Sequence, residues 1–360
     1  MNTSQLSAYL SAQRNADGSF NFSDSSKASF LATSFGVMTD FLLNGADKLD
    51  YREDTISYLN SGFGAKGGFA DPAFNISELT GTHQADYMKA QIAYFSLIAA
   101  DVLGNRHPGA ELIFSLKEEN ISLDAWFAGL DLGHFWYESN KIMFMLYFLF
   151  YEWHYTGSEK AMDMIKQLMN LLNQSQDPST GFWGTDKNGN NLLDGCFGTA
   201  HVLLFYDFLD MEIPYAQKMI DNTLGLHHPN GLIRRKNGGA CEDYDAIEIY
   251  LRCARQTNYR KADIERELVK MKGLISGAQA SNGGFAYKIE ESGLKRLVKS
   301  TLMPQHYTYS GWARMKTCTY KSDLWGTWFR VLSLKVIDYL LEGKTDFHSY
   351  WLPAWGYIKK

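Results

Sequence analysis

Asp17-Gly18-Ser19-Phe20 is the first of a series of similar stretches, and this series decides the fold. Glycine followed by an aromatic or apolar residue returns in Gly67-Gly68-Phe69, Thr180-Gly181-Phe182-Trp183, Asn230-Gly231-Leu232 and Gly283-Gly284-Phe285. Glycine next to polar residues is typical of sharp turns, so each stretch predicts a turn that joins two longer elements.

The spacing of these stretches indicates a sequence repeat. The residues that follow the glycines stand at positions 20, 69, 182, 232 and 285, which gives intervals of 49, 113, 50 and 53 residues. The longest interval is about twice the others, so we expect a degenerate copy near its middle. Ala125-Trp126-Phe127-Ala128-Gly129 occupies that place. The chain is therefore predicted to contain six copies of one unit.

Each copy continues with a polar loop, a long apolar run and a shorter amphipathic segment. Few segments alternate strictly between apolar and polar residues, and the chain has only 7 prolines, so helices are favoured over strands. The apolar runs begin near Ser29, His83, Glu138, Cys196, Glu242 and Asp323.

The repeat predicts how these helices pack. One helix hairpin cannot bury both faces of its apolar helix, but six hairpins bury them when they close into a ring. We therefore expect an all-α fold, an (α/α)6 toroid that forms one domain over residues 1–360. An open solenoid is the alternative, but solenoids usually carry polar capping repeats, and neither terminus resembles one.

Composition and charge narrow the function classes. The net charge is −5 and the pI is about 6.0, which gives no overall support for nucleic-acid binding or a basic membrane face, although a local basic patch is compatible with these values. The four cysteines form no CxxC pair, the N-terminus lacks the apolar core of a signal peptide, and no apolar stretch is long enough to cross a bilayer. We expect a cytoplasmic protein without a transmembrane segment and without a cofactor.

Polar side chains stand at the starts of the predicted inner helices, which a toroid would gather at one mouth of its cavity. A single acid at a helix start is usually a cap for backbone N–H groups. Three acids exceed that need, and burying them together would raise the pKa of one carboxyl toward that of a general acid. The candidates are His83, Asp86, Glu138, Asn140, Asp194, His201, Asp323 and the acidic cluster Glu242, Asp243 and Asp245.

Glutamine precedes three of the turns. Gln13 to Phe20 reads QRNADGSF, Gln174 to Trp183 reads QSQDPSTGFW, and Gln279 to Phe285 reads QASNGGF. This pattern resembles the glutamine-to-tryptophan repeats of the terpenoid cyclase and protein prenyltransferase toroids, and it spans essentially the whole chain. Sugar-processing toroids are built from similar helix hairpins.

Two shorter stretches match boxes of these families. Cys241-Glu242-Asp243-Tyr244-Asp245-Ala246 is similar to the DxDD box of squalene-hopene-type cyclases, in which the middle acid protonates the substrate. The resemblance gives that role to Asp245, with Asp243 on the first acid and Ala246 in place of the third. Leu193-Asp194-Gly195-Cys196-Phe197 resembles the zinc-binding DGC segment of prenyltransferase β subunits. The family's third zinc ligand is a histidine, and here the corresponding box offers Asp245, so we expect no bound metal.

Other residues are candidates for substrate contact. Arg234 and Arg235 precede a Gly-Gly pair and the acidic cluster, where a basic loop would hold a diphosphate, sulfate or uronate, or simply form a solvated turn. Trp136 and Trp325 stand near helix starts, where aromatic faces suit a carbocation or a sugar ring. The segment 186–194 partly matches a calcium loop, but the required glutamate is missing, which favours a polar turn.

Three functions are open at this point. The first is an enzyme of the terpenoid-cyclase or prenyltransferase type, acting by general-acid chemistry from Asp245 on an isoprenoid-type substrate, with Asp243 and Glu242 tuning the acid. The second is a carbohydrate-active toroid, a glycoside hydrolase, epimerase or polysaccharide lyase, which would use His83, His134, His201 and paired acids. The third is a toroid that binds a small molecule or oligosaccharide without chemistry. The glutamine-glycine-aromatic repeats and the acid box favour the first.

Overall fold

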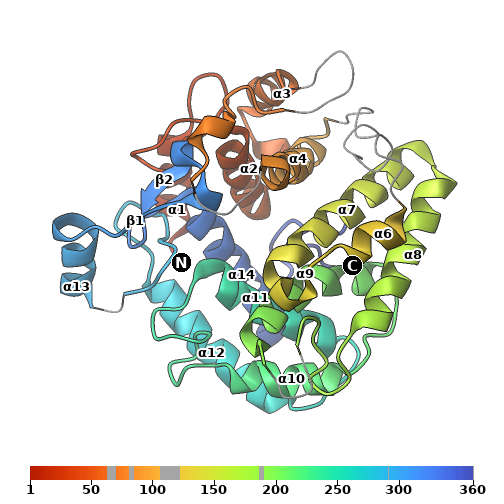
Figure 1. Cartoon of the computed structure of the whole chain (residues 1–360). Helices are drawn as coiled ribbons and strands as arrows, with labels where there is room; N and C mark the ends of the chain where they lie inside the picture. Colours follow the sequence, from red (N-terminus) through yellow and green to blue (C-terminus); the bar gives the residue numbers. More distant parts are fainter. Residues whose placement is uncertain (63–69, 81–84, 106–121, 186–189, 291, 360) are drawn as a thin grey trace.

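In the part of the chain that the structure describes, six apolar helices form the inner wall of a closed ring (Figure 1). The computed structural model describes residues 1–62, 70–80, 85–105, 122–185, 190–290 and 292–359. Each inner helix packs on the next one along the chain, and the last packs on the first, so the predicted all-α toroid is confirmed. The inner helices are α2 (Phe30–Asn44), α4 (Ala85–Val102), α7 (Phe135–Thr156), α9 (Leu192–Phe208), α11 (Ala240–Ala254) and α14 (Leu324–Glu342).

Shorter or more polar helices alternate with the inner helices and form the outer wall. In α8 the buried residues recur every three or four positions, so one face packs on the ring while the other faces solvent. The outer helices are α1 (Thr3–Gln13), α3 (Arg52–Asn60), α6 (Leu123–Ala128), α8 (Glu159–Ser175), α10 (Ala216–Gly225) and α12 (Lys261–Gly277).

The repeated glycines make the turns from outer to inner helices. Gly18, Gly181, Gly231 and Gly283 all have a positive φ, and a Cβ on Gly283 would lie 2.0 Å from the backbone oxygen of Gln5. The residue after the turn then donates its backbone N–H to a threonine hydroxyl of the following inner helix. The distances are 3.0 Å for Phe20 to Thr33, 3.3 Å for Trp183 to Thr199 and 2.9 Å for Phe285 to Thr327.

The inner helices begin close to the predicted positions. Ser29 and Asp323 cap α2 and α14, while α7, α9 and α11 begin three, four and two residues before the predicted starts. The start predicted near His83 lies outside the described residues. The degenerate copy differs from the prediction, because residues 123–128 form α6 rather than a turn. The Ser122 hydroxyl accepts the Ala125 N–H at 3.2 Å and caps this short helix, and the chain turns after Gly129.

An insertion separates α12 from α14. It contains α13 (Gly293–Leu297), the π-helical turn η5 (Val298–Leu302) and the antiparallel strands β1 (His306–Thr308) and β2 (Lys316–Cys318). The 3₁₀ turns η6 (Tyr309–Gly311) and η7 (Ala313–Met315) lie between the strands. Among the described residues, three more 3₁₀ turns are η1 (Ala46–Lys48), η2 (Ile76–Glu78) and η4 (Leu132–His134).

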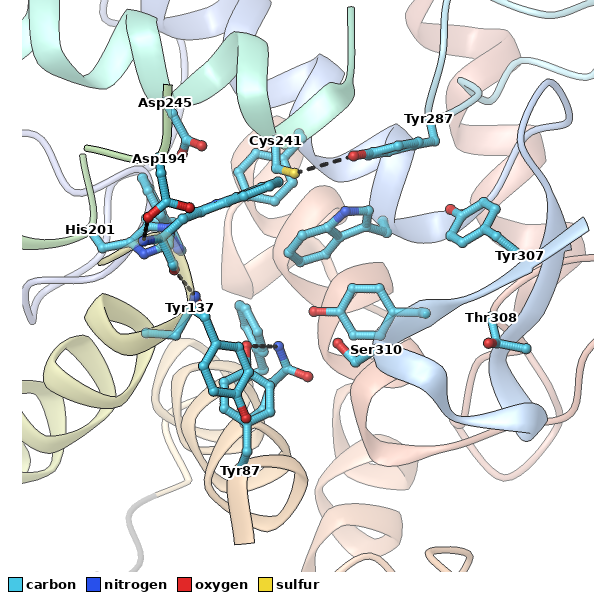
Figure 2. Close-up of a pocket in the computed structure, with 18 of the residues that line it drawn as sticks. Tyr87, Tyr137, Asp194, His201, Cys241, Asp245, Tyr287, Tyr307, Thr308 and Ser310 are labelled. Carbon is cyan, nitrogen blue, oxygen red and sulfur yellow. Dashed lines mark hydrogen bonds between the residues drawn. The ribbon is translucent and has the colours of Figure 1, made fainter. Parts of the chain in front are cut away.

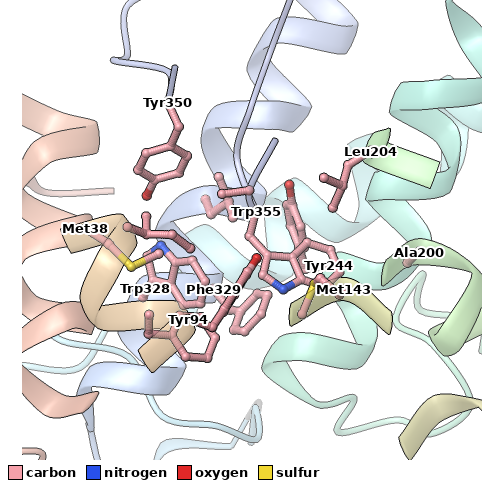
Figure 3. Packing of buried hydrophobic residues seen from close by; sticks show 14 of the residues in the cluster. Met38, Tyr94, Met143, Ala200, Leu204, Tyr244, Trp328, Phe329, Tyr350 and Trp355 are labelled. Carbon is pink, nitrogen blue, oxygen red and sulfur yellow. The ribbon is translucent and has the colours of Figure 1, made fainter. Parts of the chain in front are cut away.

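The C-terminal segment after α14 covers the end of the ring where the inner helices finish. The His348 N–H donates to the Leu42 carbonyl near the end of α2, and Arg252 near the end of α11 donates to the Tyr357 carbonyl at 2.8 Å. Tyr350 and Trp355 insert among the inner helices (Figure 3). Among the described helices, none is long and apolar enough to cross a membrane.

Candidate functional site

A cavity of about 420 Å³ lies at the end of the ring where the inner helices begin. Its walls come from the first two or three turns of α4, α7, α9, α11 and α14, from the insertion, and from Trp355 of the C-terminal segment. Ten of its nineteen lining residues are aromatic, so π faces and apolar edges dominate the wall: Tyr87, Phe95, Trp136, Tyr137, Tyr287, Tyr307, Tyr309, Trp325, Phe329 and Trp355.

Asp245 is the acid of the acidic cluster that lines this cavity. Its side chain descends from α11 toward the cavity (Figure 2). The residue is only 1% exposed, and neither carboxyl oxygen has a hydrogen-bond partner among the residues that the structure describes. Burial raises the pKa of Asp245 well above its ordinary value, and the charges of Glu242, Glu248 and Asp243 raise it further. Burial and the neighbouring carboxylates therefore both favour the protonated form of this carboxyl.

Asp243 lies two residues away but serves a different purpose. Its Oδ2 lies 2.6 Å from Nη1 of Arg330 on α14, and its Oδ1 accepts the Ile233 N–H at 2.8 Å. Both partners of this ion pair are buried. These contacts join α11 to α14 and to the turn that precedes α11. Asp243 does not line the cavity.

Glu242 lies at the rim, outside the main cavity. Its Oε2 accepts the Tyr287 hydroxyl at 2.7 Å and the Cys241 thiol at 3.2 Å. The side chain lines a small surface pocket together with Arg234 and Arg235. One helical turn separates Glu242 from Asp245, which explains why its charge raises the pKa of Asp245.

The wall formed by α7 and α9 carries the other polar groups. Asp194 accepts the Trp136 N–H at 3.0 Å and so caps the start of α7 across the helix interface. His201 is hydrogen-bonded through Nδ1 to the Ser139 hydroxyl at 2.8 Å, and burial lowers the pKa of its imidazole to about 3. The imidazole is therefore neutral. Asn140 lines the cavity and donates to the Trp136 carbonyl.

Solved structures share this architecture. The type II terpene cyclase MstE from Scytonema, in its apo form, matches with a TM-score of 0.52 and 13% sequence identity, over 94% of this chain and 97% of that chain. A protein from Actinoplanes matches with a TM-score of 0.55 and 14% identity, over 93% of this chain and 99% of that chain. A variant of MstE in complex with its substrate geranylgeranyl dihydroxybenzoate matches with a TM-score of 0.50 and 13% identity, over 94% and 96% of the two chains.

The chain has a terpenoid-cyclase-like α/α toroid fold. No protein-family model matches the sequence. No curated protein matches it either. The likeness is therefore one of architecture, and the roles of individual residues in this terpenoid-cyclase-like toroid have to be argued from their surroundings.

The terpenoid-cyclase-like toroid brings together only some of the residues predicted from sequence. Asp245, Asp194, Asn140, His201, His134, Trp136 and Trp325 line the cavity. Asp86 is exposed and paired with Lys89, and Glu138 is buried against Lys141. Arg234 and Arg235 are exposed beside Glu242. Asp323 caps α14 and accepts the Tyr307 hydroxyl at 2.9 Å, so it stands behind the cavity wall. His83 and residues 186–189 of the proposed calcium loop lie outside the described residues.

No three His, Cys, Asp or Glu side chains in the described part of the chain are grouped as metal ligands would be. Cys196 is fully buried, and burial raises the pKa of its thiol. The absence of zinc at Asp194, Cys196 and Asp245 stays a prediction from their ligand chemistry.

One wall of the cavity was missed by the sequence analysis. Tyr287, Tyr307, Thr308 and Ser310 of the insertion face Asp245 and Asp194 across the cavity (Figure 2). The length of this insertion was a usable signal, because Asp323 at the start of α14 stands 38 positions after Phe285, whereas Ser29 at the start of α2 stands only 9 positions after Phe20. Trp355 had no such signal, since the C-terminal segment carries no copy of the repeat.

Proposed function

We propose that this protein is a Brønsted-acid enzyme that protonates a carbon–carbon double bond of an isoprenoid-type substrate, with Asp245 as the acid. One observation carries the proposal: a buried carboxyl without hydrogen-bond partners among the described residues lines a largely aromatic cavity, and burial raises the pKa of that carboxyl. The likeness to MstE, a type II terpene cyclase, supports the same class of enzyme at the level of the fold.

The surroundings of Asp245 suit this step. An alkene is a very weak base. The carboxyl that protonates it must therefore still carry its proton, and no neighbouring group may accept that proton first. The O–H bond of Asp245 would break as a C–H bond forms from the π electrons, which leaves a carbocation and the Asp245 carboxylate. A second double bond of the substrate then attacks the cation and closes a ring, and loss of a proton ends the reaction.

The aromatic wall suits the charge that develops in this reaction. Faces of Trp, Tyr and Phe attract cations, by about 0.5–2 kcal/mol each depending on desolvation. Trp325 and Trp355 both contact Phe329 at the cavity, with ring centroids 4.5 Å apart for Trp325 and Phe329 and 5.9 Å apart for Phe329 and Trp355. An apolar wall also excludes water, which would otherwise trap the cation.

A carbohydrate-active enzyme is the second candidate. It is favoured by two carboxyls, Asp194 and Asp245, that line one cavity together with Asn140 and His201. Three of these groups are already occupied, because Asp194 and Asn140 bind the backbone of Trp136 and His201 binds Ser139. Fewer polar groups are thus left for sugar hydroxyls, and the isoprenoid proposal ranks first.

Turnover in D₂O with Asp245→Asn as the test variant separates the candidates. Linear isoprenoids of graded length are incubated with the protein, and products are analysed by gas chromatography and mass spectrometry. We expect cyclised or isomerised products that carry one deuterium from solvent, and a loss of about 10²–10⁴ in rate for Asp245→Asn. Asp86→Asn is the matched control, since this exposed acid should not affect the rate.

Full activity of Asp245→Asn, or products without deuterium, would refute the role of Asp245. Turnover of oligosaccharides in place of isoprenoids would support the carbohydrate-active candidate. Saturable binding of either ligand without any product would support a binding toroid.

A further inference from the structure

The insertion exposes a cluster of large apolar side chains. Leu294, Leu297, Leu302 and Met303 are 74%, 56%, 75% and 71% exposed, and they fall within ten consecutive residues of α13, η5 and the residue after it. In the described part of the chain the other exposed large apolar side chains are scattered over distant segments. Single exposed apolar residues are common in proteins, whereas a cluster marks a contact surface. Figure 1 shows α13 projecting from the side of the ring.

The same segment is basic. Residues 292–322 contain six basic residues and no Asp or Glu, although the whole chain has a net charge of −5. Lys299 is paired with Glu290 and Arg314 donates to the Ala28 carbonyl, but Lys295, Lys316 and Lys321 are exposed. The basic residues are Lys295, Arg296, Lys299, Arg314, Lys316 and Lys321.

We propose that α13 and the turn after it dock on the surface of an anionic lipid bilayer. Leucine and methionine side chains would enter the boundary between headgroups and acyl chains, and the basic residues would remain at the level of the lipid phosphates. The combination decides the occupant, because a nucleic acid would not need four exposed apolar side chains. A second copy that met this segment through its own apolar cluster would bring the basic residues of both copies together, and elsewhere in the described part of the chain the exposed large apolar side chains are scattered. An anionic membrane satisfies both the apolar and the basic components.

The docked surface is joined directly to the cavity. The chain passes from η5 into β1 and η6, whose residues Tyr307 to Ser310 line the cavity wall opposite Asp245. Docking would hold this wall near the bilayer, so that an apolar substrate dissolved in the membrane crosses little water on its way in. This last step rests on the proposed isoprenoid function, whereas the docking itself does not.

Vesicle sedimentation with the full chain tests the docking without any substrate. Vesicles of phosphatidylcholine are compared with vesicles that also contain phosphatidylglycerol, and the partition coefficient is measured for the wild type. The test variant carries Leu294→Ser, Leu297→Ser, Leu302→Ser and Met303→Ser. We expect binding to the anionic vesicles to fall by more than tenfold in this variant, because each methylene that enters the bilayer strengthens binding about fourfold. Lys295→Gln should weaken binding several-fold on anionic vesicles alone.

The matched control is Ile76→Ser with Val269→Ser, two residues that are 64% and 58% exposed but belong to η2 and α12. This control should bind like the wild type, and all variants should keep the wild-type circular dichroism and thermal midpoint. Absence of wild-type binding, or equal binding of the fourfold variant, would overturn the proposal. Self-association of the wild type that the variant with four serines abolishes would also overturn the proposal, because it would assign the surface to a second copy. Because no turnover is measured, failure of docking is distinguishable from failure of the proposed reaction.

Discussion

At the scale of single residues, two acids that are neighbours in sequence have opposite surroundings. Asp243 and Asp245 are two positions apart on α11, which turns their side chains about 200° away from each other. Asp243 therefore meets Arg330 on one side, while Asp245 lines the cavity on the other. The sequence predicted that Asp245 points into the cavity, where the structure places it, whereas its role as the acid stays a prediction. It could not predict the ion pair, because Arg330 lies 87 residues further along the chain.

Asp243→Asn should destabilise the fold without removing the proposed acid. The substitution leaves the Arg330 guanidinium buried without its carboxylate, and breaking a buried ion pair in this way typically costs about 3–5 kcal/mol. Asp245→Asn should leave stability unchanged or raise it, since no partner is lost. Urea denaturation of the two variants beside the wild type measures the difference. Equal midpoints for Asp243→Asn and the wild type would mean that this ion pair does not hold α11 to α14.

Asp323 should make stability depend on pH. Burial raises the pKa of its carboxyl from 3.8 to about 7, despite the hydrogen bonds from Gly326 and Tyr307 that lower it. The unfolded chain loses this proton near pH 4 and the folded chain near pH 7, so the stabilisation is complete below about pH 4 and is lost as the pH rises to about 7. Asp323→Asn keeps a capping side chain but cannot titrate. Between roughly pH 5 and pH 8 the variant should gain about 1–3 kcal/mol relative to the wild type in urea denaturation. A constant difference would contradict the shifted pKa.

At the scale of elements, the parts that repeat were predictable and the parts that occur once were not. Gly18, Gly181, Gly231 and Gly283 have a positive φ, which leaves a mark in the sequence at these turns. The next inner helix begins about 9 to 12 positions later in the first three cases, and only the insertion delays the start of α14. The insertion and the C-terminal segment have no second copy to compare with. Their packing, including the placement of Trp355 at the cavity, depends on contacts with residues far away in the chain.

The C-terminal segment is held by a buried charge network. Arg252 contacts Asp207 at 2.7 Å and Glu248 at 2.6 Å, and its Nη2 donates to the Tyr357 carbonyl. Arg252→Ala should cost about 3–5 kcal/mol and release the segment, which limited chymotrypsin digestion would detect as faster cleavage after residue 346. Arg260→Ala is the control, because this half-exposed arginine pairs with acids on the surface, where such pairs contribute less than about 1 kcal/mol. Equal cleavage rates in the two variants would show that other contacts hold the segment.

At the scale of the whole molecule, closure of the ring gives every inner helix two inner neighbours. This joins the core into one continuous cluster and leaves the cavity at one end, between the helix starts, the insertion and Trp355. Closure was predicted from the number of repeats and from the absence of polar capping repeats. The uneven distribution of charge was not predicted, because the net charge of −5 is a sum over a basic insertion and a more acidic remainder of the chain.

A closed ring should unfold as one unit, and the seam between the last and first inner helices is the place to test this. Trp328 of α14 is fully buried there, stacked on Phe35 of α2 at 5.7 Å and in edge contact with Phe95 of α4 at 5.6 Å. Trp328→Ala should cost about 3–5 kcal/mol. In a closed ring this loss lowers the midpoint of a single transition, and hydrogen exchange should rise in α7 and α9 together with α14. Trp183→Ala, an equally buried tryptophan away from the seam, should act in the same way. If Trp328→Ala instead gives two transitions, with α2 and α14 exchanging while α7 and α9 stay protected, the inner helices behave as an open solenoid that unravels from its ends.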